Sequence, residues 1–196
     1  MFRSLSGRLL ILTTIFVMLA EILIFVPSIA RFRVEYMMNR LERAQIASLT
    51  LLASEMIDPA LEAELLRTAE VFNVVLRRDE MRQLVLSSPM PQAIKATYDI
   101  RNASAMMLIR DAFIQLADTN DGVIRVIGAP VQDAGLLIEI TMETSALRIA
   151  MIDYGVRILA LSAAISLITA FLLFLTMRAF LLKPIKSVVG HMQNYA

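Results

Sequence analysis

Residues 158–180 read ILALSAAISLITAFLLFLTMRAF, a run in which all 22 residues other than Arg178 are uncharged. With a rise of about 1.5 Å per residue, a helix of this length crosses the roughly 30 Å hydrocarbon core of a bilayer. Arg178 lies near the end of the run, where a long side chain can extend its charge into the head-group layer. This stretch therefore predicts a transmembrane helix.

A second apolar run precedes it in the chain, at residues 9–30, with an arginine at either end (Arg8 and Arg31). Its sequence is LLILTTIFVMLAEILIFVPSIA, which is again long enough to span a bilayer. The alternative is a cleaved signal peptide, since residues 2–8 are basic and small residues lie near position 30. We favour a retained helix, because the apolar run continues past Glu21 to full spanning length.

Composition agrees with a membrane protein and excludes several other classes. Hydrophobic residues make up 58% of the 196-residue chain and the mean hydropathy is +0.66, whereas soluble domains have about 45–50% apolar residues. The net charge of +1 gives no broad basic surface for nucleic acid. The chain has no cysteine and one histidine, His191, so disulfides, cysteine zinc sites and a Ser/His/Asp triad in the central domain are excluded.

Glu21 is an acidic residue within the first predicted span. An ionised carboxylate deep in a bilayer costs about 2.5–3.5 kcal/mol on insertion scales, so a position facing lipid is disfavoured. Polar residues of the second span recur on one helical face, at Ser162, Ser166 and Thr169. We interpret Glu21 as a hydrogen-bonded packing contact with that face or with a second copy of the chain. A proton relay is the alternative, and it would need titratable partners that the second span does not offer.

The 127 residues between the spans, 31–157, begin with a helical pattern. Apolar or small residues recur at steps of three and four, which is typical of a helix that packs along one side. These residues are Val34, Met37, Leu41, Ala44, Ser48 and Leu51. A second helix is expected from Asp58 to about Val71, because aspartate is a common N-cap and Pro59 would occupy the first turn.

The pattern then changes to short strands rich in valine and leucine, at residues 72–78, 81–88, 123–129 and 136–142. A helix is expected at about 102–116, followed by the turn-forming sequence DTNDG at 118–122. The last helix of the domain is expected from about Ser145 into the second span. We therefore predict a small α+β domain with an antiparallel sheet and helices on one face.

The sequence offers several candidate ligand contacts in this domain and does not decide among them. Arginine binds small carboxylates well, and the candidates are Arg77, Arg78, Tyr98, Arg101, Arg110 and Arg125. A calcium loop at 118–122 is disfavoured, because its glycine is fifth rather than sixth and Ala129 occupies the twelfth position, where the ion needs a glutamate. The order of elements resembles the PAS-like extracytoplasmic sensor domains of bacterial receptors, a resemblance that implies a fold and no particular ligand.

After the second span, residues 181–196 read LLKPIKSVVGHMQNYA. Pro184 would begin a new helix, and Ile185, Val188, Met192 and Tyr195 recur at steps of three and four. This segment resembles the first helix of a HAMP domain, the parallel four-helix signalling module of bacterial receptors. The resemblance implies that Pro184, Ile185, Val188 and Met192 transmit the signal within a parallel homodimer.

The whole layout resembles the amino-terminal input half of a bacterial membrane sensor histidine kinase. That resemblance implies an inner-membrane protein, with residues 1–8 in the cytoplasm, residues 31–157 in the periplasm, and lipid and a possible small molecule as partners. Phosphoryl transfer to a response regulator, with ATP and magnesium, would belong to a kinase region beyond residue 196. The chain itself has no expected catalytic residue, cofactor or metal, because it has no glycine-rich nucleotide loop and His191 lacks the surroundings of a phosphoacceptor histidine.

Two other functions remain open at this point. A chemoreceptor or a cyclase can share the same input plan, since HAMP domains serve several outputs. A two-span membrane assembly protein without signalling activity is an alternative of another class, and it would not need the pattern at Ile185 and Val188. A transporter is disfavoured, because two spans with one acidic residue provide little of a pathway.

Overall fold

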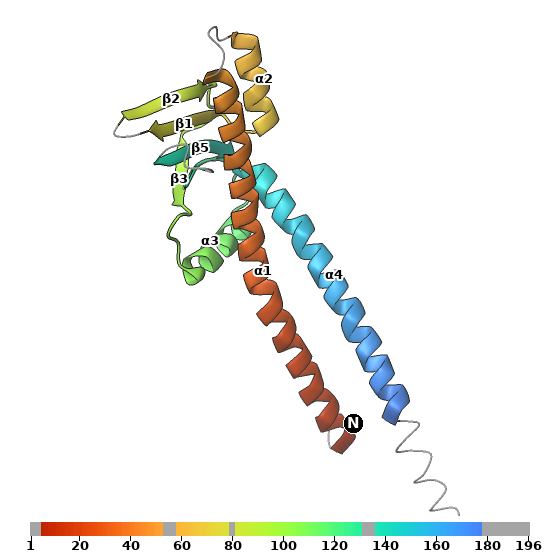
Figure 1. Ribbon diagram of the computed structural model, residues 1–196. Helices are drawn as coiled ribbons and strands as arrows, with labels where there is room; N and C mark the ends of the chain where they lie inside the picture. The colour runs from red at the N-terminus through yellow and green to blue at the C-terminus, as the bar shows by residue number, and fades with distance from the viewer. Residues whose placement is uncertain (1–4, 53–57, 79–80, 131–135, 178–196) are drawn as a thin grey trace, which may run out of the picture. The chain divides into compact units, whose positions relative to one another are not determined.

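The computed structural model describes residues 5–52, 58–78, 81–130 and 136–177 (Figure 1). The chain divides into two compact units. One consists of residues 1–25 and 156–196, and the other of residues 26–155. Two long helices, α1 (Leu5–Leu52) and α4 (Thr144–Met177), contribute residues to both units.

Both long helices contain a segment that is long and apolar enough to cross a membrane. These apolar segments lie within the helical stretches Thr14–Thr50 and Thr144–Leu172. Large apolar side chains in them are exposed, for example Leu23 at 75% and Leu167 at 74%, whereas a soluble protein buries most of such a helix in its core. These observations support a membrane location and agree with the two predicted spans.

The unit of residues 26–155 is built on a five-stranded sheet with the order β2-β1-β5-β4-β3. Every neighbouring pair is antiparallel except β3 and β4, which are parallel. The strands are β1 (Asn73–Arg78), β2 (Met81–Ser87), β3 (Ile94–Asp99), β4 (Val123–Gly128) and β5 (Leu137–Glu143). The α+β class is therefore confirmed, and the sheet is mixed.

The core lies on one face of the three central strands. Val74 of β1 pairs with Ile140 of β5, which pairs with Val126 of β4, and all three are at most 1% exposed. Residues two positions along each strand repeat the pattern, because alternate side chains of a strand point to the same face. Leu147 and Met151 of α4 and Met37 of α1 are also fully buried, so both long helices contribute to the core.

Helix α2 (Pro59–Ala69) begins as the sequence predicts. The side chain of Asp58 accepts a hydrogen bond of 3.0 Å from the backbone N–H of Ala60, and Pro59 occupies the first turn. The helix ends at Ala69 rather than near Val71, because Glu70 adopts the left-handed conformation at φ 54°. This backbone turn redirects the chain into β1.

The predicted stem is also present within α1. Met37, Leu41, Ala44 and Ser48 are buried, and the side chain of Leu51 lies outside the described residues. Leu41 lies close to Gly128, since its Cδ1 would be 2.5 Å from a Cβ added there. Leu41 therefore packs against the end of strand β4.

The expectation of an all-antiparallel sheet is wrong, because β3 was not predicted. The side chains of β3 alternate between half-buried and exposed, and its sequence IKATYD carries little hydrophobic signal at an edge of the sheet. Helix α3 (Ala105–Ala117), capped by Ser104, connects β3 to β4. A crossover of this kind allows the two strands to run parallel, which a short turn cannot do.

Candidate functional site

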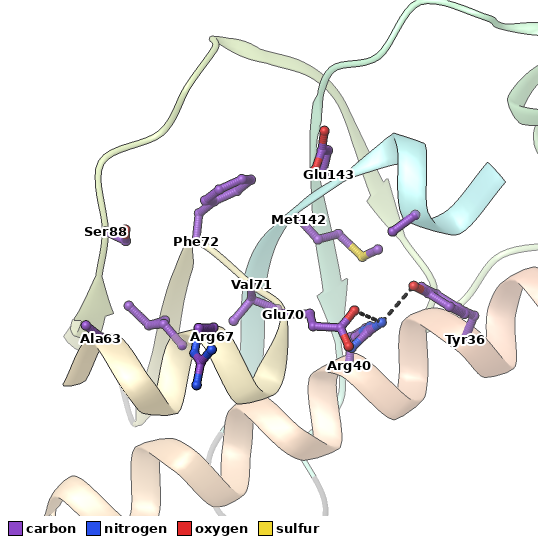
Figure 2. Close-up of a pocket in the computed structure, with 12 residues that line it drawn as sticks. Tyr36, Arg40, Ala63, Arg67, Glu70, Val71, Phe72, Ser88, Met142 and Glu143 are labelled. Atoms are coloured by element: carbon purple, nitrogen blue, oxygen red, sulfur yellow. Dashed lines mark hydrogen bonds and ion pairs between the residues drawn. The ribbon is translucent and has the colours of Figure 1, made fainter. Parts of the chain in front are cut away.

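A cavity of about 370 Å³ lies within the unit of residues 26–155 (Figure 2). Its walls come from α1, α2, the connection between α2 and β1, the end of β5 and the first turn of α4. The lining residues include Leu66, Val71 and Met142, which are 3%, 6% and 1% exposed. Its volume falls within the range of about 300–1,000 Å³ that is typical of small-molecule sites.

Arg40 of α1 is the most buried charged group of this cavity, and its side chain is 9% exposed. Its Nη2 donates a 2.7 Å hydrogen bond to the hydroxyl oxygen of Tyr36 and a short one to the Glu70 carboxylate. Nη1 donates to the backbone carbonyl of Ala69 at 3.5 Å. Figure 2 shows the Tyr36 and Glu70 side chains on either side of the Arg40 guanidinium group.

The electrostatics of Arg40 follow from these contacts. Burial acts to lower the pKa of Arg40, but the hydrogen bonds to Glu70 and Tyr36 outweigh burial, and the pKa is raised overall. The guanidinium also lies over the Tyr36 ring, 4.8 Å from its centroid. Arg40 is therefore a fixed cation at the wall of the cavity.

Glu70, in contrast, lies at the rim, and its side chain is 54% exposed. Its backbone N–H donates to the carbonyl oxygen of Arg67 at 3.1 Å, and the next residue, Val71, donates to Leu66 at 3.1 Å. These bonds end α2 with a left-handed residue, a position where glycine is favoured because a Cβ is strained there. Glu70 therefore connects the end of α2 to α1 through Arg40 despite an unfavourable backbone conformation.

A second buried arginine, Arg33, lies elsewhere on α1. It is 1% exposed, and its guanidinium lies over the Tyr98 ring of β3 at 4.2 Å from the centroid. Its Nε and Nη2 groups have no hydrogen-bond partner among the described residues. Burial lowers the pKa of Arg33, and Tyr98 and Asp111 only partly oppose that effect.

The arginines proposed from the sequence as ligand contacts do not form one site. Arg101 pairs with Asp99 at 2.6 Å, Arg110 with Asp111 at 2.9 Å, and Arg125 approaches Glu139 at 3.8 Å. Arg77 is exposed, and the side chain of Arg78 lies outside the described residues. The Tyr98 ring contacts the guanidinium group of Arg33.

Residues 118–122 connect α3 to β4. The Asp118 carboxylate accepts a 3.1 Å hydrogen bond from the backbone N–H of Asn120 and pairs with Lys95. Among the described residues, no group of three or more acidic or histidine side chains is arranged to hold a metal ion. The hydrogen bonds are those of a turn that caps the end of α3, as the sequence interpretation expected.

Glu21 lies in the other unit, where α1 and α4 also meet. The hydroxyl of Ser166 donates a 3.0 Å hydrogen bond to Oε1 of Glu21. Ser162 and Thr169 line the same cavity of about 310 Å³ beside Glu21. The helix-to-helix contact expected for Glu21 is therefore present, and Ser166 is the residue that makes it.

The predicted signalling residues Pro184, Ile185, Val188 and Met192, together with His191, lie outside the described residues. Their proposed roles remain predictions.

Neither Arg40 nor Glu70 was predicted from the sequence as a site residue, although the chain carries a signal for Arg40. Arg33, Met37, Arg40 and Ala44 follow steps of four, three and four, so both arginines fall on the buried side of the stem helix. A charged residue on such a side is unusual, since buried charges need partners. Glu70 gave no comparable signal, because its importance depends on a contact 30 positions away in sequence.

Comparison of the chain with known protein families, curated proteins and solved structures finds no match.

Proposed function

We propose that this chain is the input half of a membrane receptor built on the plan of bacterial sensor histidine kinases. The observation that carries the proposal is that α1 and α4, which contain the two candidate spans, both line one pocket of the folded domain. Tyr36 and Arg40 come from α1, and Ala146 comes from the first turn of α4. A ligand in that pocket contacts both helices that continue toward the membrane.

Direct contacts between the two helices support this coupling. Phe32 of α1 and Tyr154 of α4 stack with ring centroids 4.2 Å apart and an angle of 13° between the rings. In the other unit, Glu21 and Ser166 join the same pair of helices. Paired helices of this kind transmit signals by shifts of about 1–2 Å, because packed interfaces favour discrete arrangements over continuous deformation.

In this proposal the domain of residues 31–157 is a PAS-like sensor in the periplasm of a bacterium. Residues 181–196 begin a HAMP module in the cytoplasm. A kinase region beyond it would use ATP and magnesium to phosphorylate itself and then a response regulator. A reporter after residue 196 is expected in the cytoplasm and one inserted at Asn120 outside it, so alkaline phosphatase activity at residue 196 would contradict this orientation.

The coupling is tested by linking α1 to α4 in a chimera. Residues 1–196 are fused to the rest of the HAMP module and the kinase region of a characterised, cysteine-free sensor kinase, and Phe32 and Tyr154 are both replaced by cysteine. Because the chain has no cysteine of its own, a short, reducible thiol cross-linker joins only the introduced pair. The reduced form of the same protein is the matched control.

The pocket is perturbed in this chimera by Glu70→Gln, which removes the charge that pairs with Arg40. Autophosphorylation should differ between Glu70→Gln and the parent in the reduced form, and the difference should disappear when α1 and α4 are linked. Equal kinase activity in all four states would refute coupling between the pocket and the membrane helices. A difference that survives cross-linking would show that the signal does not travel by movement between these helices.

Dimerisation is tested separately at the predicted HAMP helix. Cysteine in place of Val188 should cross-link between chains in membranes, because that side of the helix would be buried against other helices. Cysteine in place of Lys186, on the opposite side, is the control. Equal cross-linking at both positions would favour the alternative of a membrane assembly protein without a signalling helix.

A further inference from the structure

The cavity next to Arg40 combines one buried cation with apolar walls. Arg40 lies at the wall, and the apolar lining includes Leu66, Val71, Phe72 and Met142. The guanidinium group and the Tyr36 hydroxyl next to it offer planar hydrogen-bonding geometry, which suits a carboxylate better than a neutral polar group. The apolar walls suit a short hydrocarbon chain.

Of the three partners of Arg40, the Glu70 carboxylate is the one that a ligand can replace. The side chain of Arg40 is 9% exposed, whereas that of Glu70 is 54% exposed. Glu70 also has a left-handed backbone conformation, which favours glycine over any residue with a Cβ. The carboxylate of Glu70 thus approaches the buried cation from the solvent side, at the residue where α2 ends.

We propose that this cavity binds a small monocarboxylate with an apolar tail, and that Glu70 is an internal competitor that occupies Arg40 in its absence. The bound carboxylate takes the place of the Glu70 carboxylate on Arg40, and its tail lies along the apolar walls. Release of Glu70 breaks the ion pair that joins the end of α2 to α1. The inference rests on the proposed receptor function, for which it names the class of ligand.

The charges around the opening select for a single negative charge. Glu143 also lines the cavity and is exposed, whereas the other cation of the lining, Arg67, is already paired with Glu64 at 2.7 Å. A ligand with a second carboxylate would bring like charges together near Glu70 and Glu143, an arrangement that costs binding energy. A ligand without a carboxylate would leave the Arg40 contact unused.

The experiment uses the whole chain in lipid nanodiscs and measures binding of sodium hexanoate by calorimetry. Hexanol, hexylamine and the dicarboxylate adipate are compared at the same concentrations, and empty nanodiscs correct for partition into lipid. Saturable binding of hexanoate, with at least tenfold weaker binding of the other three compounds, is the expected result. Comparable binding of hexanol would show that only the apolar walls matter and would overturn the proposal.

Variants test the competition. Glu70→Gln should tighten hexanoate binding about two- to fivefold, the effect expected from the loss of an ion pair whose carboxylate is 54% exposed. Arg40→Met should abolish binding, and Tyr36→Phe, which keeps the ring and loses the hydroxyl, should weaken it severalfold without the risk of exposing a buried charge. Glu35→Gln is the matched control, because it breaks the exposed Arg31–Glu35 pair on α1, whose residues do not line the cavity, and it should leave the affinity unchanged.

The outcomes separate the inference from the function on which it rests. No saturable binding in either the parent chain or Glu70→Gln, or weaker binding in Glu70→Gln, overturns the inference. Binding in Glu70→Gln alone supports it, because the competitor then blocks the site in the parent chain. If hexanoate binds as expected but leaves the kinase activity of the chimera unchanged, the ligand class stands and the receptor function fails.

Discussion

Arg33 allows a sharp test of what a buried cation does in this domain. It is 1% exposed, its Nε and Nη2 have no partner among the described residues, and its only ring contact there is with Tyr98. Each unsatisfied buried donor costs about 1–3 kcal/mol, whereas a desolvated cation–π contact returns about 2 kcal/mol. The balance predicts that Arg33 destabilises the fold.

Arg33→Met removes the charge and both unpartnered donors and keeps a flexible apolar chain of similar length. We expect the free energy of unfolding of the domain to rise by about 1–2 kcal/mol, since replacement of buried charges by apolar residues is often stabilising. With a urea dependence of about 2 kcal/mol per molar, the midpoint should increase by roughly 0.5–1 M. Pulse proteolysis of the chain in nanodiscs at increasing urea concentrations measures this unfolding midpoint.

Two further variants make the interpretation specific. Tyr98→Leu leaves the charge buried and removes the ring that faces it, so stability should fall by about 1–2 kcal/mol. Arg33→Lys keeps the charge but loses the planar stacking, and it should also destabilise the fold. A loss of more than about 1 kcal/mol in Arg33→Met would refute the reasoning, because it would mean that a partner such as Asp111 compensates the buried charge.

Three further predictions concern other parts of the chain. Glu21→Gln should keep assembly and chimera output close to the parent, whereas Glu21→Leu should alter them through loss of a hydrogen bond worth about 1 kcal/mol; equal damage in both would indicate a proton relay. Gly128→Ala should cost about 1 kcal/mol in urea unfolding, because the new Cβ would lie 2.5 Å from Cδ1 of Leu41, and the cost should vanish in a Leu41→Ala background. The hydrogen bond from Lys95 is the main reason that the pKa of Asp118 is lowered. The stabilisation from this pair should therefore be complete above the unfolded pKa of about 3.9 and lost as the pH falls through the lower folded pKa. Urea midpoints at pH of about 6 and about 3 should therefore differ less in Lys95→Met than in the parent chain, and an equal difference would contradict this assignment.

Local sequence signals predicted the elements that depend on neighbouring residues. The N-cap at Asp58, with Pro59 in the first turn of α2, is an interaction within one helical turn, and the structure contains it. The two apolar runs needed no tertiary information either, because length and hydropathy alone decide whether a helix can cross a bilayer. Strand β3 escaped detection because an edge strand with half-exposed side chains carries little hydrophobic pattern.

The candidate site illustrates the opposite case. The positions of Arg33 and Arg40 on the buried side of the stem were accessible from periodicity alone. Their partners were not, because Tyr98 and Glu70 reach them from elements distant in sequence. Three of the arginines chosen from the sequence, Arg101, Arg110 and Arg125, pair instead with acids.

The sequence by itself therefore determined the two long apolar helices, the α+β class of the domain and most of its helices and strands, because these follow from the period and length of local patterns. Only the tertiary structure decided that β3 runs parallel to β4, that Glu21 is paired with Ser166, and that Arg40 meets Glu70 at a cavity. Such contacts depend on chain segments brought together by folding, and their chemistry is invisible to any short window of sequence.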